Sequence, residues 1–88
     1  MRAVYLDCRA ILSREALHGA LARTLDLPEW YGRNLDALAD CLGDIAAETE
    51  LHMVAFAALE QQLGDYAARL HRVLTGAQAE NPSFRVVF

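Results

Sequence analysis

The chain has 88 residues and is 55% hydrophobic, which is enough for the core of one small domain spanning residues 1–88 and too apolar for a disordered chain. Its net charge is −4, and seven of the twelve acidic residues lie between positions 26 and 50, where Arg33 is the one base. This concentration of negative charge argues against direct binding of nucleic acid and favours a basic protein partner.

No apolar run is long enough to span a membrane, and the N-terminal sequence MRAVYLDCR lacks the pattern of a signal peptide. We therefore expect a cytoplasmic protein. Two cysteines, Cys8 and Cys41, are too few for a disulfide framework. In a reducing compartment we interpret both as structural thiols rather than redox groups.

The first part of the chain predicts a strand followed by a helix. A short apolar run favours a strand over residues 3–6, and residues 7–10 are expected to form a loop. Ser13 is a suitable N-cap, and apolar residues then recur at helical spacing, which predicts a helix over about 14–25.

Pro28 and Gly32 mark a turn that carries two adjacent aromatic residues, Trp30 and Tyr31. Aromatic side chains of this kind are common at interface hot spots, but they also pack in cores. We expect one of the two rings to be buried and the other to be partly exposed.

Asn34 is the N-cap of the next predicted helix, which covers about 35–46 and has two distinct faces. Apolar residues at helical spacing form one face, and aspartates four residues apart form another on the opposite side. Like charges at this spacing repel by about 0.2–0.5 kcal/mol per pair, so the row indicates either a binding site or an ordinary solvated face. The apolar residues are Leu35, Leu38, Leu42 and Ile45, and the aspartates are Asp36, Asp40 and Asp44.

The remaining sequence predicts two strands with two helices between them. Residues 51–56 are almost continuously apolar, which is typical of a parallel strand covered on both faces. A helix over 57–63 is expected to end at Gly64, and Asp65 to cap a last helix that runs to about residue 81. Residues 84–88 form the final strand. The predicted fold is therefore α/β: a three-stranded parallel sheet packed with about four helices.

Residues for catalysis or metal binding do not form a recognisable motif. The three histidines are too scattered for a zinc motif; we interpret His52 as a paired or edge residue of a strand, and His18 and His71 as helix-surface residues. The chain has no lysine and no phosphate-binding glycine loop, so we expect neither enzymatic activity nor a cofactor. A Mg²⁺-dependent phosphohydrolase that uses the aspartate row is a weaker alternative, because carboxylates four residues apart are separated by roughly 6 Å along the helix axis.

The segment LPEWYGRNLDALADCL, residues 27–42, closely resembles the central segment of the barstar family of bacterial ribonuclease inhibitors. The chain length, the order of elements and the Ala-x-Ala-Glu sequence at the end of the last helix are also similar to that family. The resemblance implies a three-stranded parallel sheet with helices. It also implies that the 35–46 helix and the loop before it occupy the active site of a ribonuclease, with carboxylates in place of RNA phosphates.

Carried over residue by residue, the resemblance makes Asp40 the main acidic contact, with Asp36 beside it and Trp30 as an interfacial aromatic. The sequence departs from the family at four positions, which implies a different cognate nuclease. The family has a tryptophan where this chain has Ala39, an aromatic residue at Ile45, an acid at Gly76 and a glycine at Asp44. The candidate partner-binding residues are Trp30, Asn34, Leu35, Asp36, Ala39, Asp40, Gly43, Asp44 and Glu80.

The leading hypothesis is a monomeric, non-enzymatic inhibitor that binds a basic ribonuclease, or a ribonuclease-type toxin domain, in a one-to-one complex. The alternative is a protein-interaction module of the same fold whose basic partner is not a nuclease.

Overall fold

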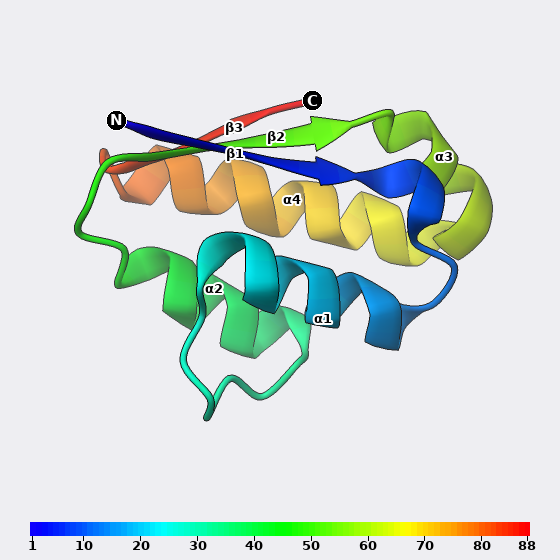
Figure 1. Cartoon of the computed structure of the whole chain (residues 1–88), viewed down its shortest axis with the longest axis horizontal. Helices are drawn as coiled ribbons and strands as arrows, with labels where there is room; N and C mark the ends of the chain where they lie inside the picture. Colours follow the sequence, from blue (N-terminus) through cyan, green and yellow to red (C-terminus); the bar gives the residue numbers. More distant parts are fainter.

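The computed structural model describes all of residues 1–88 and contains one sheet and four α-helices. The elements in chain order are β1 (Arg2–Asp7), a short 3₁₀ helix (Cys8–Ala10), α1 (Arg14–Leu25), α2 (Leu35–Gly43), β2 (Thr49–Val54), α3 (Phe56–Leu63), α4 (Asp65–Glu80) and β3 (Phe84–Val87). β2 is the central strand and pairs in parallel with β1 and β3. α1, α2 and α4 lie on one side of the sheet, and α3 lies at its end (Figure 1).

The α/β fold predicted from the sequence is confirmed, with differences at some element boundaries. α1 begins where predicted, because the Ser13 hydroxyl accepts a hydrogen bond of 3.0 Å from the Ala16 N–H. Residues 8–10, expected as a loop, form the short 3₁₀ helix. Asp65 does not cap α4: Gly64 takes that position with φ 56° and ψ −127°, a conformation that glycine adopts more readily than other residues.

The sheet buries only one of its two faces, so the prediction that the central strand is covered on both faces is wrong. Leu51 and Met53 of β2 are buried, whereas His52 between them is half-buried and Val54 is exposed. No helix lies over the side of the sheet that carries His52 (Figure 1). The apolar run extends beyond β2 because Phe56 already belongs to α3.

The hydrophobic core lies between the covered face of the sheet and the helices. Leu17 of α1, Leu38 of α2, Leu51 of β2 and Leu70 of α4 are all fully buried in it. Every layer of the fold thus contributes to one continuous core. None of the helices has the length and apolarity needed to cross a membrane.

Both cysteines are buried free thiols. Burial raises the pKa of Cys8 to about 11 and also raises the pKa of Cys41. Since the thiolate is the reactive form, these raised pKa values favour unreactive, protonated thiols near neutral pH. The geometry therefore agrees with structural roles for both residues.

The three histidines lie in different environments. His52 is paired, as predicted, since its Nε2 lies 2.6 Å from a carboxylate oxygen of Glu50. His71 is exposed on α4, also as predicted. The prediction that His18 lies on the surface of its helix is wrong, because only 1% of this residue is exposed.

His18 is held by two tyrosine hydroxyls from distant parts of the chain. Its Nδ1 hydrogen-bonds to the Tyr31 hydroxyl in the loop before α2, and its Nε2 lies 2.6 Å from the Tyr66 hydroxyl on α4. A neutral imidazole has one donor and one acceptor, and a hydroxyl can serve as either, so the three groups satisfy one another without a charge. Burial lowers the pKa of His18, and the nearby positive charge of Arg33 lowers it further against the opposing effect of Glu15.

This lowered pKa predicts that the protein loses stability in mildly acidic solution. His18 titrates near 6.5 when exposed and below that value in the folded protein. As the pH is lowered through 6.5, the unfolded chain therefore binds more protons than the folded one. The free energy of unfolding decreases as the pH is lowered. One proton sets a maximum slope of about 1.4 kcal/mol per pH unit.

Urea unfolding between pH 7.5 and about 5.5 measures this effect, above the range in which ordinary carboxylates titrate. The exposed control, His71→Gln, is expected to keep the same pH slope, whereas His18→Gln is expected to flatten it. An equal slope in both variants would contradict the assignment to His18.

Candidate partner-binding surface

The loop between α1 and α2 holds one aromatic ring inside the protein and projects the other. Tyr31 is buried, and its N–H donates a hydrogen bond of 2.9 Å to the Pro28 carbonyl, which closes a turn. Trp30, its neighbour in the sequence, is 73% exposed. The expectation of one buried and one exposed ring is confirmed, and the Trp30 ring is accessible to a partner.

Asn34 fixes the start of α2 in the way the sequence predicts. Its side-chain oxygen accepts a hydrogen bond of 2.8 Å from the Ala37 N–H, and its side-chain nitrogen donates to the Gly32 carbonyl at 3.2 Å. The same residue therefore caps the helix and fixes the turn that enters it. Arg33, just before the cap, has φ 54°, a left-handed conformation that directs the chain into the helix.

The two faces of α2 point in the directions predicted from their spacing. Leu38 and Leu42 are fully buried and Leu35 is 8% exposed, so the leucine face packs into the core. Asp36 and Asp40 are exposed on the other side. The exposed residues of α2 and its C-cap are Asp36, Ala39, Asp40, Gly43 and Asp44.

α2 ends at Gly43, earlier than predicted, so that Asp44 is its C-cap and not part of the helix face. Asn81, the C-cap of α4, lies next to this end, and its side-chain nitrogen donates to the carbonyls of Leu42 at 2.8 Å and Ile45 at 3.0 Å. Carbonyls at a helix C-terminus have few donors within the helix, and the Asn81 side chain is an additional donor for this end of α2. These hydrogen bonds also join the ends of α2 and α4.

A groove of about 400 Å³ lies between α2 and α4. Ala39 and Gly43 of α2 and Gly76 of α4 line it, and a Cβ atom added at either glycine would meet nothing within 4 Å. Their small side chains leave the groove open. Glu80, from the last turn of α4, also lines it.

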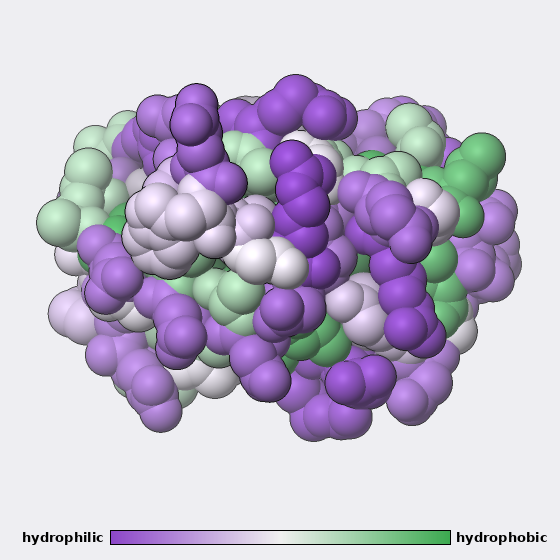
Figure 2. Space-filling view, turned by 90° about the horizontal axis from the view of Figure 1, so that it is seen from below, coloured by the Kyte–Doolittle hydropathy of each residue, from purple (hydrophilic) through white to green (hydrophobic).

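The aspartates of α2 are not neutralised by other residues of the chain. The structure contains only two ion pairs, Arg9 with Asp7 at 2.8 Å and His52 with Glu50 at 2.6 Å. The side of the molecule seen from below is mostly hydrophilic, with small hydrophobic areas between polar side chains (Figure 2). No three His, Cys, Asp or Glu side chains are placed to hold a metal ion.

The nine candidate residues all lie in the loop before α2, on α2 and its C-cap, or at the end of α4. Eight of them line three hollows, and the ninth, Asp40, is exposed on α2. Leu35 is largely buried and offers a partner little surface. Asn34, Leu35 and Asp36 line a cleft at the start of α2; Ala39, Gly43 and Glu80 line the groove; Trp30 and Asp44 line a pocket of about 190 Å³.

Sequence reasoning missed the residues that share the cleft with the start of α2. Arg14 and Arg69 come from α1 and α4 and meet there only in the folded chain, so no local pattern indicates them. His18 did carry a signal, because it precedes Leu21 by three residues and Leu25 by seven, which places it on the buried face of α1.

Comparison with known proteins identifies the family. The family model described as barstar (barnase inhibitor) matches residues 1–88. The Bacillus subtilis (strain 168) protein named "Putative ribonuclease inhibitor YrdF" is 38% identical over 89 residues, which cover 99% of this chain and 98% of that protein. The family is one of inhibitors and not of enzymes, which confirms the prediction of a non-enzymatic protein. This chain, with its capped helix and exposed row of aspartates, belongs to the barstar family.

Proposed function

We propose that this protein is an immunity-type inhibitor that binds a basic ribonuclease in a one-to-one complex inside the cell. In this proposal α2 and the loop before it cover the active site of the nuclease. The family and the name of the B. subtilis relative support a ribonuclease as the partner. The exposed, unpaired aspartates of α2 are the observation that carries the mechanism.

The aspartates act as substitutes for RNA phosphates. A nuclease that binds RNA neutralises its phosphates with arginine and lysine side chains, and these same cations attract carboxylates. Asp36 and Asp40 are exposed and form no ion pair within the chain, so no internal ion pair has to break when they meet the partner. Their desolvation is then offset by new pairs across the interface.

Trp30 and the groove between α2 and α4 supply the apolar part of the interface. The Trp30 ring is exposed next to the buried Tyr31, so it is presented from a fixed turn. Ala39 and Gly76 leave the groove empty, so a partner needs a side chain that fills it. We therefore expect a cognate nuclease whose surface differs from that of nucleases bound by family members with a tryptophan in place of Ala39.

Titration of the protein into an RNA-cleavage assay tests this function. The assay uses barnase and other small basic ribonucleases, and we expect cleavage to fall to zero at one equivalent of protein for the cognate enzyme. The alternative function is a module that binds a basic protein other than a nuclease. Pull-down from the source cell distinguishes the two: a captured basic partner without ribonuclease activity would replace the inhibitor proposal by the alternative.

Replacing Asp40 by alanine is expected to weaken the complex with the inhibited nuclease by at least ~2 kcal/mol, because the partner's cations lose a desolvated counter-charge. Glu60→Ala is the matched control, since Glu60 is exposed on α3 and far along the chain from α2. Calorimetry of both variants measures the difference. Equal affinities for the two variants would refute the role of Asp40.

Trp30→Ala is expected to weaken the same complex by about 1–3 kcal/mol through loss of buried apolar area. Because Trp30 is 73% exposed in the free protein, the substitution is expected to leave the urea midpoint almost unchanged. A large loss of stability with no loss of affinity would show that the ring supports the fold instead.

Electrostatic attraction predicts that association depends on salt. Screening shortens the range of the field from about 30 Å at 0.01 M salt to about 10 Å at 0.1 M. The association rate constant is expected to rise several-fold over this range as salt is lowered, with a much smaller change in the dissociation rate. Stopped-flow mixing measures both rates, and an association rate that does not vary with salt would contradict the proposal.

A further inference from the structure

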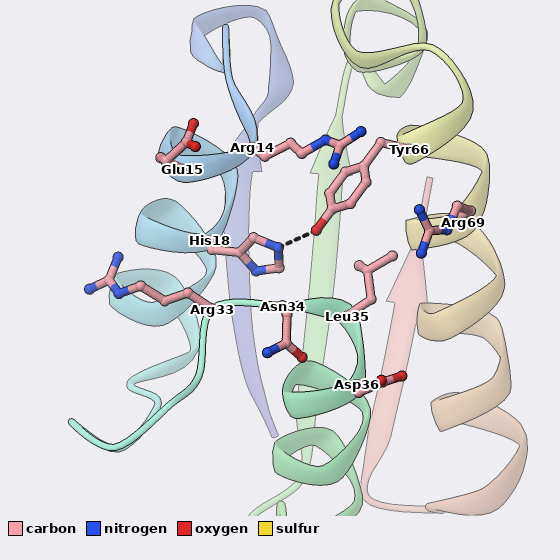
Figure 3. Close-up of a pocket in the computed structure, with 9 residues that line it drawn as sticks. All are labelled: Arg14, Glu15, His18, Arg33, Asn34, Leu35, Asp36, Tyr66 and Arg69. Atoms are coloured by element: carbon pink, nitrogen blue, oxygen red, sulfur yellow. Dashed lines mark hydrogen bonds between the residues drawn. The ribbon is translucent and has the colours of Figure 1, made fainter.

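One cleft of the molecule is lined by an excess of positive charge, whereas the aspartate row is negative. It has a volume of about 580 Å³ and lies where the starts of α1, α2 and α4 meet (Figure 3). Three arginines line it, against two carboxylates, in a chain whose net charge is −4. The lining residues that carry charge are Arg14, Arg33, Arg69, Glu15 and Asp36.

Arg14 and Arg69 converge on the ring of Tyr66. The guanidinium carbon of Arg14 lies 4.3 Å from the ring centroid, and that of Arg69 lies 5.6 Å from it. Figure 3 shows both side chains directed toward Tyr66 from α1 and α4, whereas Arg33 and Glu15 extend away from the cleft on its far side. Two positive charges are therefore held around one aromatic ring.

Nothing in the chain neutralises these two positive charges. Glu15 and Asp36 line the same cleft, but neither lies within ion-pair distance of Arg14 or Arg69, since the only ion pairs of the structure are elsewhere. The face of the Tyr66 ring stabilises a guanidinium charge only in part, and the N–H donors of both groups have no carboxylate partner. An anion bound in the cleft would use these free N–H donors and balance the excess of positive charge.

The base of the cleft is fixed before any ligand arrives. Tyr66 is 8% exposed, and its hydroxyl lies 2.6 Å from Nε2 of the buried His18. The ring that carries both arginines is therefore held in place by α1. The capped start of α2, with Asn34 and Leu35 in the lining, adds the positive end of a helix dipole.

We propose that this cleft is an oxyanion-binding site whose charged ligands are Arg14 and Arg69. The group bound is a phosphate or a carboxylate, since both match the planar donors of arginine. The two sources are a free phosphate compound and an acidic side chain of a protein. The site does not depend on ribonuclease inhibition, because its two charged ligands, Arg14 of α1 and Arg69 of α4, lie outside the aspartate row and have the opposite charge.

NMR titration of the ¹⁵N-labelled protein with inorganic phosphate, and separately with acetate, tests the site at constant ionic strength, with chloride as the reference. Saturable shifts are expected at the amides of Leu35 and Tyr66. Arg14→Gln and Arg69→Gln are each expected to weaken binding at least ~10-fold, which corresponds to about 1.4 kcal/mol. The matched control Arg85→Gln removes an exposed arginine of β3 and is expected to bind as the unaltered protein does.

Comparison of the two probes identifies the source of the anion. Tighter binding of phosphate assigns the site to a phosphate compound, and tighter binding of acetate assigns it to an acidic side chain of a protein. The proposal is overturned if the shifts fail to saturate, match those caused by chloride, or persist in both glutamine variants. Should the glutamine variants unfold, Arg14→Lys and Arg69→Lys keep the positive charge and are expected to retain binding with reduced affinity.

Discussion

The surface chemistry of this protein depends on the burial of one face of α2. Leu38 and Leu42 are fully enclosed in the core, and residues four apart on a helix share a side. Burial of the leucines therefore fixes the direction of Asp36 and Asp40 toward solvent. The repulsion between the aspartates, a few tenths of a kcal/mol per pair, is small beside the roughly 1.5–3 kcal/mol gained by burying each leucine. The core thus stabilises a row of charges that the isolated helix would disfavour.

Two asparagines hold this helix in position. Asn34 satisfies a free N–H group at its start, and Asn81 satisfies two carbonyls at its end. Asn81 belongs to the end of α4, so the second contact fixes α2 relative to α4 as well. The groove lined by Ala39 and Glu80 therefore lies between two tethered helices, and its width is set by the fold before a partner binds.

Most of the fold could be predicted because its signals are local. The Ser13 and Asn34 caps and the spacing of apolar residues locate the starts of α1 and α2. What escaped prediction depends on residues far apart in the sequence. The end of α2 accepts a hydrogen bond from Asn81, which lies 39 residues beyond Leu42. The hydroxyls that satisfy the buried His18 belong to Tyr31 and Tyr66, which come from two other segments.

The candidate site also contains features that the local sequence predicts and features that depend on residues far apart in the chain. The exposed aspartates and Trp30 follow from the pattern of one segment and from the family resemblance, whereas the arginine cleft exists only after three helices have met. Asp36 lines the cleft and also begins the aspartate row, so the arginines of α1 and α4 lie beside the start of that row. A basic partner that approached in the reverse direction would place its cations on Arg14 and Arg69, where like charges repel. In the proposed complex, the positive cleft at the start of α2 therefore favours one orientation of the partner over the reverse.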